Sequence, residues 1–231
     1  DQLVQNTVAL SDAAKVMGLA AYGKTDRFAD VKLIEKNDLD LKVIGYDFMQ
    51  NMHSPNDWNE ANIQGYRDLA YKVQAELEDA ALHIATKLYE RHRIPNLCIA
   101  GGIGLNCIAN GKLLLNSGYK SIFLPPSPGD SGSALGAAFF GYLQEGSSRN
   151  RFPMKNAYWG RPYNDSDIWD RLTWFLNRHY LKSRITITKT DAIDEDVAQF
   201  IAAGKIVGWF QGGAEFGPRA LGARSILCDP R

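Results

Sequence analysis

LCIAGGIGLN at residues 97–106 and SIFLPPSPGD at residues 121–130 follow one plan, a short apolar run that enters a loop rich in glycine or proline. The apolar runs, Leu97–Ala100 and Ser121–Leu124, predict two buried strands. A helix of about Asn106–Asn116 is expected between them, and a helical crossover makes the strands that it joins parallel. Both loops would then lie at the carboxyl edge of one sheet, where open α/β sheets bind ligands.

Helical patterns flank these strands on both sides. Upstream, apolar residues recur at helical spacing from Tyr66 to Leu88, and Pro95 is expected to end that helix. Downstream, a helix is expected over about Ser131–Glu145. Strands that alternate with helices in this way predict an α/β fold. Residues 25–64 are mixed and polar, and their pattern allows no assignment.

A segment rich in glycine, serine, asparagine and proline, residues 146–165, is interpreted as a linker. Beyond it we expect a helix around Ile168–Leu176, a half-exposed strand around Ile185–Ile187, a helix that ends at Gly204, and a buried strand at Ile206–Phe210. Because strands and helices restart after the linker, we predict two domains, residues 1–150 and residues 151–231.

Composition narrows the class of protein. The chain has 231 residues, 45% of them hydrophobic, which is enough for a buried core. Its 26 basic and 26 acidic residues balance, which argues against a nucleic-acid partner, because such proteins carry a basic excess. Three cysteines without a CxxC pair indicate reduced thiols and a cytoplasmic protein, and no apolar run reaches the length of a membrane helix. The sequence starts without methionine, so we expect it to be part of a longer protein.

The glycine-rich loop Gly101–Asn106 is a candidate nucleotide site, because glycine lets the backbone approach a phosphate and the following helix adds positive potential. A packing turn with Asn106 as the N-cap of that helix explains the same residues equally well. A dinucleotide fingerprint is disfavoured, since Cys107 stands where its last glycine would fall. On its local pattern, Asp130 is better explained as an N-cap of the next helix than as a metal ligand.

EFGPRALGARS, residues 215–225, places Arg219 and Arg224 among glycines directly after an expected strand. Arginine forks and exposed backbone N–H groups both suit a phosphate, so we interpret this loop as an anion-binding site. The alternative, a surface turn with solvated arginines, explains poorly why both arginines fall within it. The histidines predict no metal site, because the two that share a helix, His83 and His92, lie on opposite faces.

Five motifs, taken together in their order along the chain, resemble the NodU/CmcH-type O-carbamoyltransferases, a family that includes nodulation-factor and antibiotic carbamoyltransferases. The motifs are KVMGLAAYG (residues 15–23), GGIGLNCIANGKLL (101–114), LPPSPGDSGSALGAA (124–138), AYWGRPY (157–163) and EFGPRALGARSILCDPR (215–231). Each motif is modest alone, whereas the ordered series is highly specific.

The resemblance implies part of an actin-like ATPase (ribonuclease H-like) domain, followed by the start of an α/β domain like threonylcarbamoyl-AMP synthase. It implies that the second domain activates carbamoyl phosphate with ATP to carbamoyl-adenylate. The first domain would then transfer the carbamoyl group to a hydroxyl of a small-molecule acceptor, assisted by a divalent metal of the iron type. Neither nucleic acid nor a membrane is expected as a partner.

The same resemblance implies roles for eight residues by position. These are nucleotide binding for Lys15, Gly18, Gly101, Gly102 and Asn106, carbamoyl phosphate or phosphate binding for Arg219 and Arg224, and a metal contact for Asp130. The family's paired metal histidines, in an HxxxH motif, have no counterpart here, and most of the activating domain would follow Arg231. One aspartate does not hold a catalytic metal tightly, so we expect these 231 residues alone to be inactive.

Two other functions remain open from the sequence. A tRNA threonylcarbamoyl-modification protein would share the nucleotide domain, but the GPRALGARS segment and the balanced charge disfavour it. A non-catalytic nucleotide-binding domain would bind ATP without any need for carbamoyl phosphate. Neither the acceptor nor the oligomeric state follows from the sequence.

Overall fold

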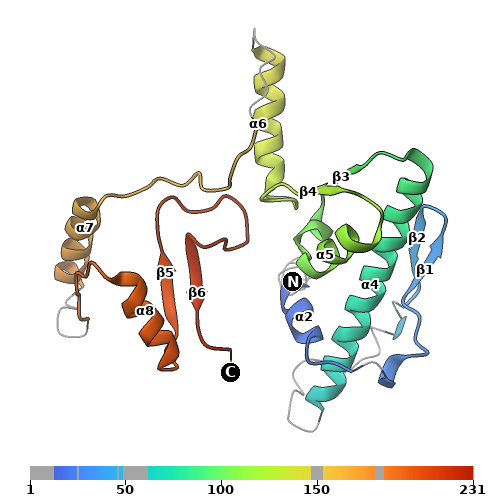
Figure 1. The fold of residues 1–231 in the computed structure, drawn as a ribbon, viewed down its shortest axis with the longest axis horizontal. Coiled ribbons are helices and arrows are strands. Elements are labelled where there is room, and N and C mark those ends of the chain that lie inside the picture. Colours follow the sequence, from blue (N-terminus) through green and yellow to red (C-terminus); the bar gives the residue numbers. More distant parts are fainter. Residues whose placement is uncertain are drawn as a thin grey trace. The chain divides into compact units, whose positions relative to one another are not determined.

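The computed structural model describes residues 13–24, 26–45, 47–48, 62–146, 153–179 and 185–230. It is a mixed α/β structure that divides into two compact units, residues 1–129 and residues 130–231, which are described separately (Figure 1). The predicted domain boundary between residues 150 and 151 lies outside the described residues.

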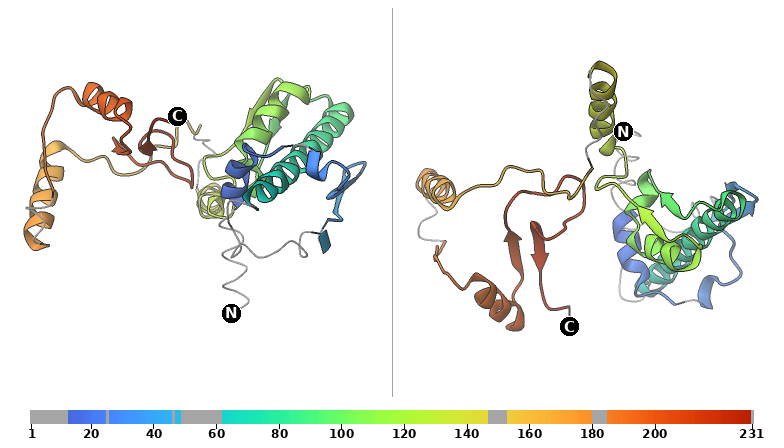
Figure 2. Two further views of the ribbon diagram at one scale, coloured as in Figure 1. Left: turned by 90° about the horizontal axis from the view of Figure 1, so that it is seen from below. Right: turned by 45° about the horizontal axis from the view of Figure 1, so that its top comes forward.

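The first unit is organised around one long helix, α4 (Ile63–His92). The helix predicted from Tyr66 onward is confirmed, although it begins earlier, at Ile63, and it ends before Pro95 as expected. Figures 1 and 2 show α2 (Ala13–Ala20) and α5 (Cys107–Asn116) lying against α4. The helix α4 therefore packs against α2, which contains Lys15 and Gly18, and against α5, which Asn106 precedes. These are segments for which nucleotide contacts were predicted.

The strands β3 (Asn96–Cys98) and β4 (Ser121–Phe123) are parallel, as predicted, with Leu97 opposite Ile122. The prediction that they are buried is wrong, because their side chains alternate. Leu97 and Ile122 pack on the core between α4 and α5, whereas Cys98 is exposed. Within the described part of this unit, helices cover only one face of the pair.

A hairpin occupies part of the segment whose sequence pattern allowed no assignment. Its strands, β1 (Ile34–Asn37) and β2 (Asp40–Val43), are antiparallel and follow the short 3-10 helix η1 (Asp26–Phe28). The turn places Asp38 at φ 52°, a conformation that aspartate tolerates better than most residues. Arg91 of α4 forms an ion pair with Asp38 at 2.9 Å, which fixes the hairpin to the helix.

The second unit contains three helices and an antiparallel strand pair among its described residues. These are α6 (Gly132–Glu145), α7 (Asp165–Arg178), α8 (Ile193–Ala202), β5 (Val207–Phe210) and β6 (Arg224–Leu227). All three helices were predicted, and Gly204 lies just past the end of α8 as expected.

Three expectations for this unit are wrong. Residues 185–190 form no regular element and are largely exposed, so the strand expected around Ile185–Ile187 is absent. The strand expected at Ile206–Phe210 is not buried, since Ile206 is 76% exposed. The end of the arginine-rich motif, expected as loop, forms β6, in which Arg224 pairs with Phe210. Apolar composition predicted the burial of β5, but its side chains alternate between half-buried and exposed, and its main neighbours among the described elements are β6 and α8.

Two other sequence expectations concern membranes and thiols. None of the helices in the described ranges combines the length and the apolar character that crossing a membrane requires. All three cysteines are free and exposed, in agreement with the prediction that they form no disulfide framework.

Candidate functional site

The glycine loop is shaped by its contact with the loop after β4. Gly101 adopts φ 97°, which only glycine adopts readily, and its N–H donates to the Pro128 carbonyl at 2.7 Å. Within the following 3-10 turn η3 (Gly102–Leu105), a Cβ on Gly104 would lie 2.9 Å from Pro128 Cβ. The prediction that these two loops meet at the carboxyl edge of the strands is therefore confirmed for residues up to Gly129.

Asn106 caps α5, as one of the two interpretations of the glycine loop predicted. Its Oδ1 accepts a hydrogen bond from Ala109 N at 3.1 Å. The same amide pairs reciprocally with Gln74 of α4: Gln74 Nε2 donates to Asn106 Oδ1 at 3.1 Å, and Asn106 Nδ2 donates to Gln74 Oε1 at 2.8 Å. The orientation of this side chain is thus set by a residue on a different helix.

The amide pair extends into a polar seam between α4 and α5. Gln74 Nε2 also donates to Glu78 Oε1 at 2.7 Å, and Glu78 forms an ion pair with Lys112 of α5. Only 9% of Glu78 is exposed. Sequence reasoning missed Gln74 and Glu78, because polar residues within a helical pattern usually indicate a solvent-facing side.

The segment that includes Lys15 and Gly18 lies in α2, and both residues are exposed. A Cβ on Gly18 would meet nothing within 4 Å, so this glycine leaves open space above the helix backbone. A close backbone approach occurs at Gly23, the last residue of the KVMGLAAYG motif, where a Cβ would lie 2.2 Å from the Arg67 carbonyl oxygen. The far end of the segment is therefore packed tightly on α4, and α2 itself presents its glycine outward.

A buried carboxylate, Asp68, anchors the same segment to α4. Its Oδ1 accepts from Lys24 N at 2.9 Å and from Gln64 Nε2 at 2.8 Å. Burial by itself would raise the pKa of Asp68, but these hydrogen bonds and the positive charge of Arg27 outweigh it and lower the pKa below its ordinary value. The anchor is thus ionised and pairs with backbone, which fixes where α2 lies.

Asp130 is exposed and directly follows Gly129. The alternative that it caps the next helix is wrong, because the N-cap of α6 is Ser131. Among the described residues, Asp130 accepts a hydrogen bond through its backbone carbonyl, from Ser133 N at 3.0 Å. Among the described residues, no three His, Cys, Asp or Glu side chains come together as a metal site would require. These residues alone do not fit a tightly held divalent metal.

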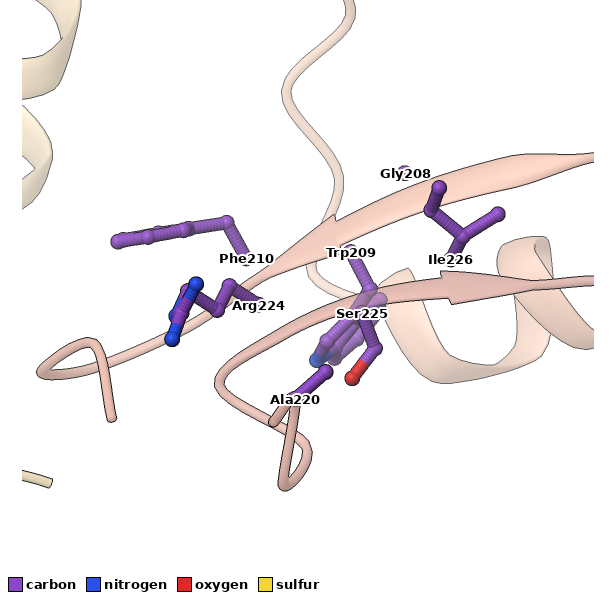
Figure 3. A pocket seen from close by; sticks show the side chains of 7 residues that line it. All are labelled: Gly208, Trp209, Phe210, Ala220, Arg224, Ser225 and Ile226. Carbon is purple, nitrogen blue, oxygen red and sulfur yellow. The ribbon is translucent and has the colours of Figure 1, made fainter. Parts of the chain in front are cut away.

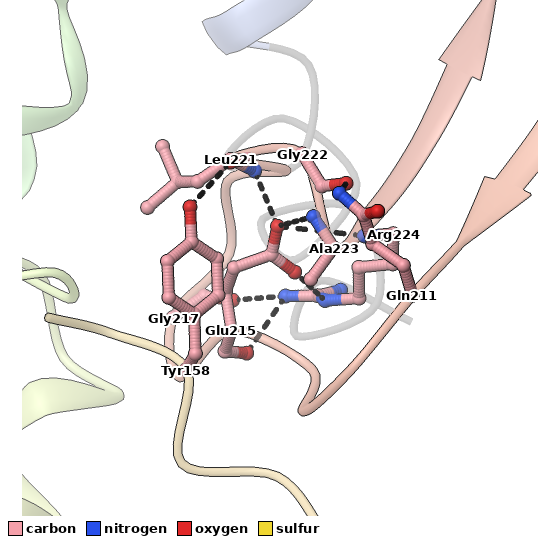
Figure 4. Close-up of polar contacts among 8 residues, drawn as sticks. All are labelled: Tyr158, Gln211, Glu215, Gly217, Leu221, Gly222, Ala223 and Arg224. Carbon is pink, nitrogen blue, oxygen red and sulfur yellow. Dashed lines mark hydrogen bonds and ion pairs between the residues drawn. The ribbon is translucent and has the colours of Figure 1, made fainter. Parts of the chain in front are cut away.

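The arginine loop, residues 211–224, is built around the carboxylate of Glu215 (Figure 4). Glu215 Oε1 accepts from the backbone N–H of Leu221 at 2.6 Å, of Ala223 at 2.7 Å and of Arg224 at 3.4 Å. Its Oε2 lies 3.2 Å from Arg224 Nε, an ion pair that lacks hydrogen-bond alignment. The Glu215 side chain therefore holds the last part of the loop, from Leu221 to Arg224, in place.

The environment of Glu215 keeps it ionised. Its side chain has 0% exposure. Burial alone would raise the pKa of Glu215, but backbone N–H donors, its own and those of Leu221, Ala223 and Arg224, lower the pKa to about 2. Sequence reasoning missed this role; the available signal was a lone acid between an apolar strand and a glycine-rich turn.

Residues 157–160, the AYWG part of the motif within the predicted linker, form hydrogen bonds with the arginine loop. Gly160 N donates to the Ala214 carbonyl at 2.9 Å, and Phe216 N donates to the Ala157 carbonyl at 2.7 Å. The hydroxyl of Tyr158 donates to the Leu221 carbonyl at 2.8 Å. Residues 157–160, expected to be part of a linker, thus belong structurally to the loop.

The two arginines of the loop occupy different environments. Arg219 is half-buried, at the turn of the loop. Arg224 is held by Glu215, and beside it lies a hollow of about 640 Å³ (Figure 3). The hollow is lined by Gly208, Trp209, Phe210, Ala220, Arg224, Ser225 and Ile226. The guanidinium is the one charged group in this mainly apolar lining.

Comparisons with known proteins agree with the motifs. The chain matches the model of the carbamoyltransferase N-terminus over residues 6–139 and that of the carbamoyltransferase C-terminus over residues 198–231. The chain therefore belongs to the carbamoyltransferase family, as its motif series predicted. The first match contains the glycine loop, and the second contains the arginine loop.

Three relatives illustrate the match. Nodulation protein NolO of Bradyrhizobium diazoefficiens is 34% identical over 227 residues, which is 95% of this chain and 40% of NolO. The 3'-hydroxymethylcephem-O-carbamoyltransferase of Streptomyces clavuligerus is 30% identical over 234 residues, 95% of this chain and 39% of that enzyme. Nodulation protein U of Rhizobium fredii is 36% identical over 142 residues, 60% of this chain and 21% of that protein. The chain thus spans about two fifths, or less, of the length of these relatives.

Proposed function

We propose that the protein is an O-carbamoyltransferase that activates carbamoyl phosphate with ATP to carbamoyl-adenylate and transfers the carbamoyl group to a hydroxyl of a small molecule. One observation carries the proposal: a single chain holds a preshaped glycine loop within the N-terminal match and a preshaped arginine loop within the C-terminal match. The name of the Streptomyces relative, a cephem O-carbamoyltransferase, supports a hydroxyl acceptor.

In this proposal the first unit is part of an actin-like domain that binds the adenylate. The exposed backbone of Gly101 and Gly102 lets a phosphate or ribose approach closely, and Asn106 sets the start of α5, whose N-terminus favours an anion. Lys15 and Gly18 contribute from α2, where Lys15 is exposed and no side chain covers Gly18. Holding AMP in place would supply much of the rate enhancement through positioning.

The second unit, in the same proposal, begins the domain that forms carbamoyl-adenylate. The arginine loop binds carbamoyl phosphate there, since guanidinium groups and backbone N–H groups together stabilise phosphate charge. Activation consumes one water and releases inorganic phosphate from carbamoyl phosphate, and the carbamate oxygen then bonds to the α-phosphorus of ATP as the bond to pyrophosphate breaks. Transfer follows when the acceptor hydroxyl oxygen bonds to the carbamoyl carbon. The bond from that carbon to the adenylate oxygen breaks, AMP leaves, and the hydroxyl proton is released.

For the metal, the proposal assigns one ligand in this chain. Asp130 would provide one carboxylate to a divalent, iron-type cation, whose charge would polarise the carbamoyl carbonyl. Because the described residues bring no three possible ligands together, the remaining ligands would have to come from elsewhere in the protein.

A direct test follows labelled carbamoyl from carbamoyl phosphate, with ATP present, to a panel of small-molecule hydroxyl acceptors, using the protein at its full native length. We expect label in an acceptor and formation of AMP, both lost when ATP is omitted. ATP consumption without label in any acceptor, or label transfer without ATP, would contradict the proposal.

A further inference from the structure

The amide pair of Gln74 and Asn106 has a fixed polarity, because a group with a single hydrogen-bonding role stands at each end of it. At the Asn106 end, Ala109 N donates to the side chain at 3.1 Å, and a backbone N–H cannot accept. At the Gln74 end, the carboxylate of Glu78 accepts from the side chain at 2.7 Å, and an ionised carboxylate cannot donate. The oxygen of Asn106 must therefore face Ala109, and the nitrogen of Gln74 must face Glu78.

Neither amide can turn over without a loss at one end. A turned Asn106 would bring its Nδ2 against the N–H of Ala109. A turned Gln74 would bring its Oε1 against the carboxylate of Glu78. The acid that sets this polarity is 9% exposed, and Lys112 of α5 compensates its charge, so the polar seam adds no net charge beside the glycine loop.

This polarity decides what Asn106 still offers to a ligand. Its Oδ1 already accepts two hydrogen bonds, from Ala109 N and from Gln74 Nε2. Its Nδ2 carries two hydrogens, and among the described residues one of them is used, by Gln74 Oε1 at 2.8 Å. The half-buried side chain thus presents a donor to a ligand and no acceptor.

We propose that Gln74 and Glu78 are positioning residues that hold the Asn106 amide with its nitrogen toward a phosphate oxygen of the bound nucleotide. The inference rests on the proposed function for the nucleotide itself, and it adds which group of the nucleotide Asn106 contacts. A phosphate oxygen only accepts hydrogen bonds, which matches the remaining donor, whereas the amino group of adenine would find no acceptor here. The exposed backbone of Gly101 and Gly102 precedes Asn106, and the N-terminus of α5 follows it; both favour an anion.

Calorimetric titrations of the full-length protein with AMP and with adenosine test the contact. Gln74→Met keeps the length of the side chain and removes its polar atoms. It should lower AMP affinity a few-fold, because Asn106 loses its support but keeps its cap bond to Ala109. Adenosine, which has no phosphate, should bind as it does to the native protein. An equal loss for AMP and adenosine would overturn the inference.

A double-mutant cycle tests whether Gln74 acts through Asn106. Asn106→Ser removes the amide but keeps an oxygen that can cap α5, since serine is a good N-cap residue. Alone it should lower AMP affinity by about tenfold or more, the loss of a hydrogen bond to a charged group. Gln74→Met should then add nothing. Effects that multiply would mean that Gln74 acts by another route, and would overturn the inference.

Glu78→Gln gives a result whose direction separates positioning from simple charge. The variant removes a negative charge near the proposed phosphate, which alone would tighten AMP binding. However, Lys112 only donates and would take the oxygen of the new amide, so that its nitrogen faces Gln74 and opposes the native polarity. We therefore expect AMP binding to weaken a few-fold, and tighter binding would overturn the inference. Asp79→Asn removes an exposed acid from the next position of α4 and is the matched control, which should leave AMP affinity unchanged.

The inference and the proposed function fail in distinguishable ways. If the native protein binds AMP but transfers no carbamoyl group, the proposed function fails, and the AMP titrations still decide the role of the amide pair. If transfer is established and Gln74→Met binds AMP as the native protein does, only the inference fails. A native protein that binds no AMP would overturn both, because Asn106 would then meet no phosphate.

Discussion

The glycine loop and the arginine loop are both held in one shape, but by different means. The glycine loop takes its constraints from other elements: Gly101 bonds to Pro128, and Asn106 pairs with Gln74 on α4. The arginine loop takes its central constraint from Glu215, which lies within the loop itself. The glycine loop is thus held by neighbouring elements, whereas the arginine loop is held mainly by an acidic side chain of its own.

This difference predicts how each loop responds to damage. Several independent contacts share the task in the glycine loop, so removal of one should weaken the site in part. In the arginine loop, three backbone donors and an ion pair converge on Glu215. Removal of that carboxylate leaves all of these groups without their partner at once, and unpartnered buried polar groups are costly.

The largest effect is expected for Glu215→Ala. Release of the loop should misplace Arg219 by about an ångström or more, and displacement of that size costs about 100-fold in rate. The measurement is kcat/KM for carbamoyl phosphate in the full-length protein. Amide exchange at Gly102 and Asn106 serves as the control and should stay native, and equal disturbance of both loops would show that the comparison is wrong.

The next effect is expected for Gly101→Ala. Alanine at φ 97° is strained, with a cost of about 1–3 kcal/mol. We expect a lower melting temperature and nucleotide affinity reduced by about tenfold, measured by calorimetry with AMP. Gly111→Ala is the matched control: it lies inside α5 with nothing within 4 Å of a new Cβ, and should stabilise by about 0.5–1 kcal/mol. Equal stabilisation by both changes would remove the argument for a required glycine at 101.

The sequence predicted the parts of the fold that local patterns determine. The parallel order of β3 and β4 followed from the helix between them, and the N-cap role of Asn106 was one of the two interpretations that its place before that helix allowed. Burial did not follow, because it depends on which faces are covered: Ile206 was expected inside and is 76% exposed. Apolar composition cannot say how many layers surround a strand.

The sequence motifs indicated which loops form the candidate site, but not which residues hold those loops in shape. Glycines and arginines indicate a loop through their own chemistry, and Gly101 and Arg219 were identified in this way. Gln74 and Glu215 act through contacts with residues distant in sequence or hidden within a turn. A glutamine on a helix, or one acid among glycines, has many ordinary explanations, and only coordinates show which backbone groups it meets.

A smaller effect is expected for Gln74→Ala. The change removes the reciprocal amide pair and the contact with Glu78, at a cost of about 1 kcal/mol. The N-cap bond from Ala109 to Asn106 remains, so α5 should persist and AMP affinity should fall only a few-fold. Lys87→Ala, in an exposed pair on the same helix, is the control and should be nearly neutral. A loss as large as that of Glu215→Ala would mean that the glycine loop also depends on one side chain.

The sharpest test of the internal charge is the pH dependence of the Glu215→Gln difference. The pKa of Glu215 is lowered from 4.5 to about 2. Burial opposes this shift, and the backbone N–H donors prevail. The stabilisation from ionised Glu215 is therefore fully present above the unfolded pKa and is lost as the pH falls from about 4.5 toward 2.

Unfolding free energies of the native and Glu215→Gln proteins, measured from about pH 7 to about pH 2, give the difference. It should be constant above about pH 5.5 and shrink below, as the protonated acid comes to resemble the amide. Asp68 and Glu76, whose pKa values are also lowered, are present in both proteins and cancel. A difference that changes between about pH 5.5 and 7 would indicate a raised pKa and a neutral Glu215. The arginine loop would then be held by a neutral side chain, as the glycine loop is.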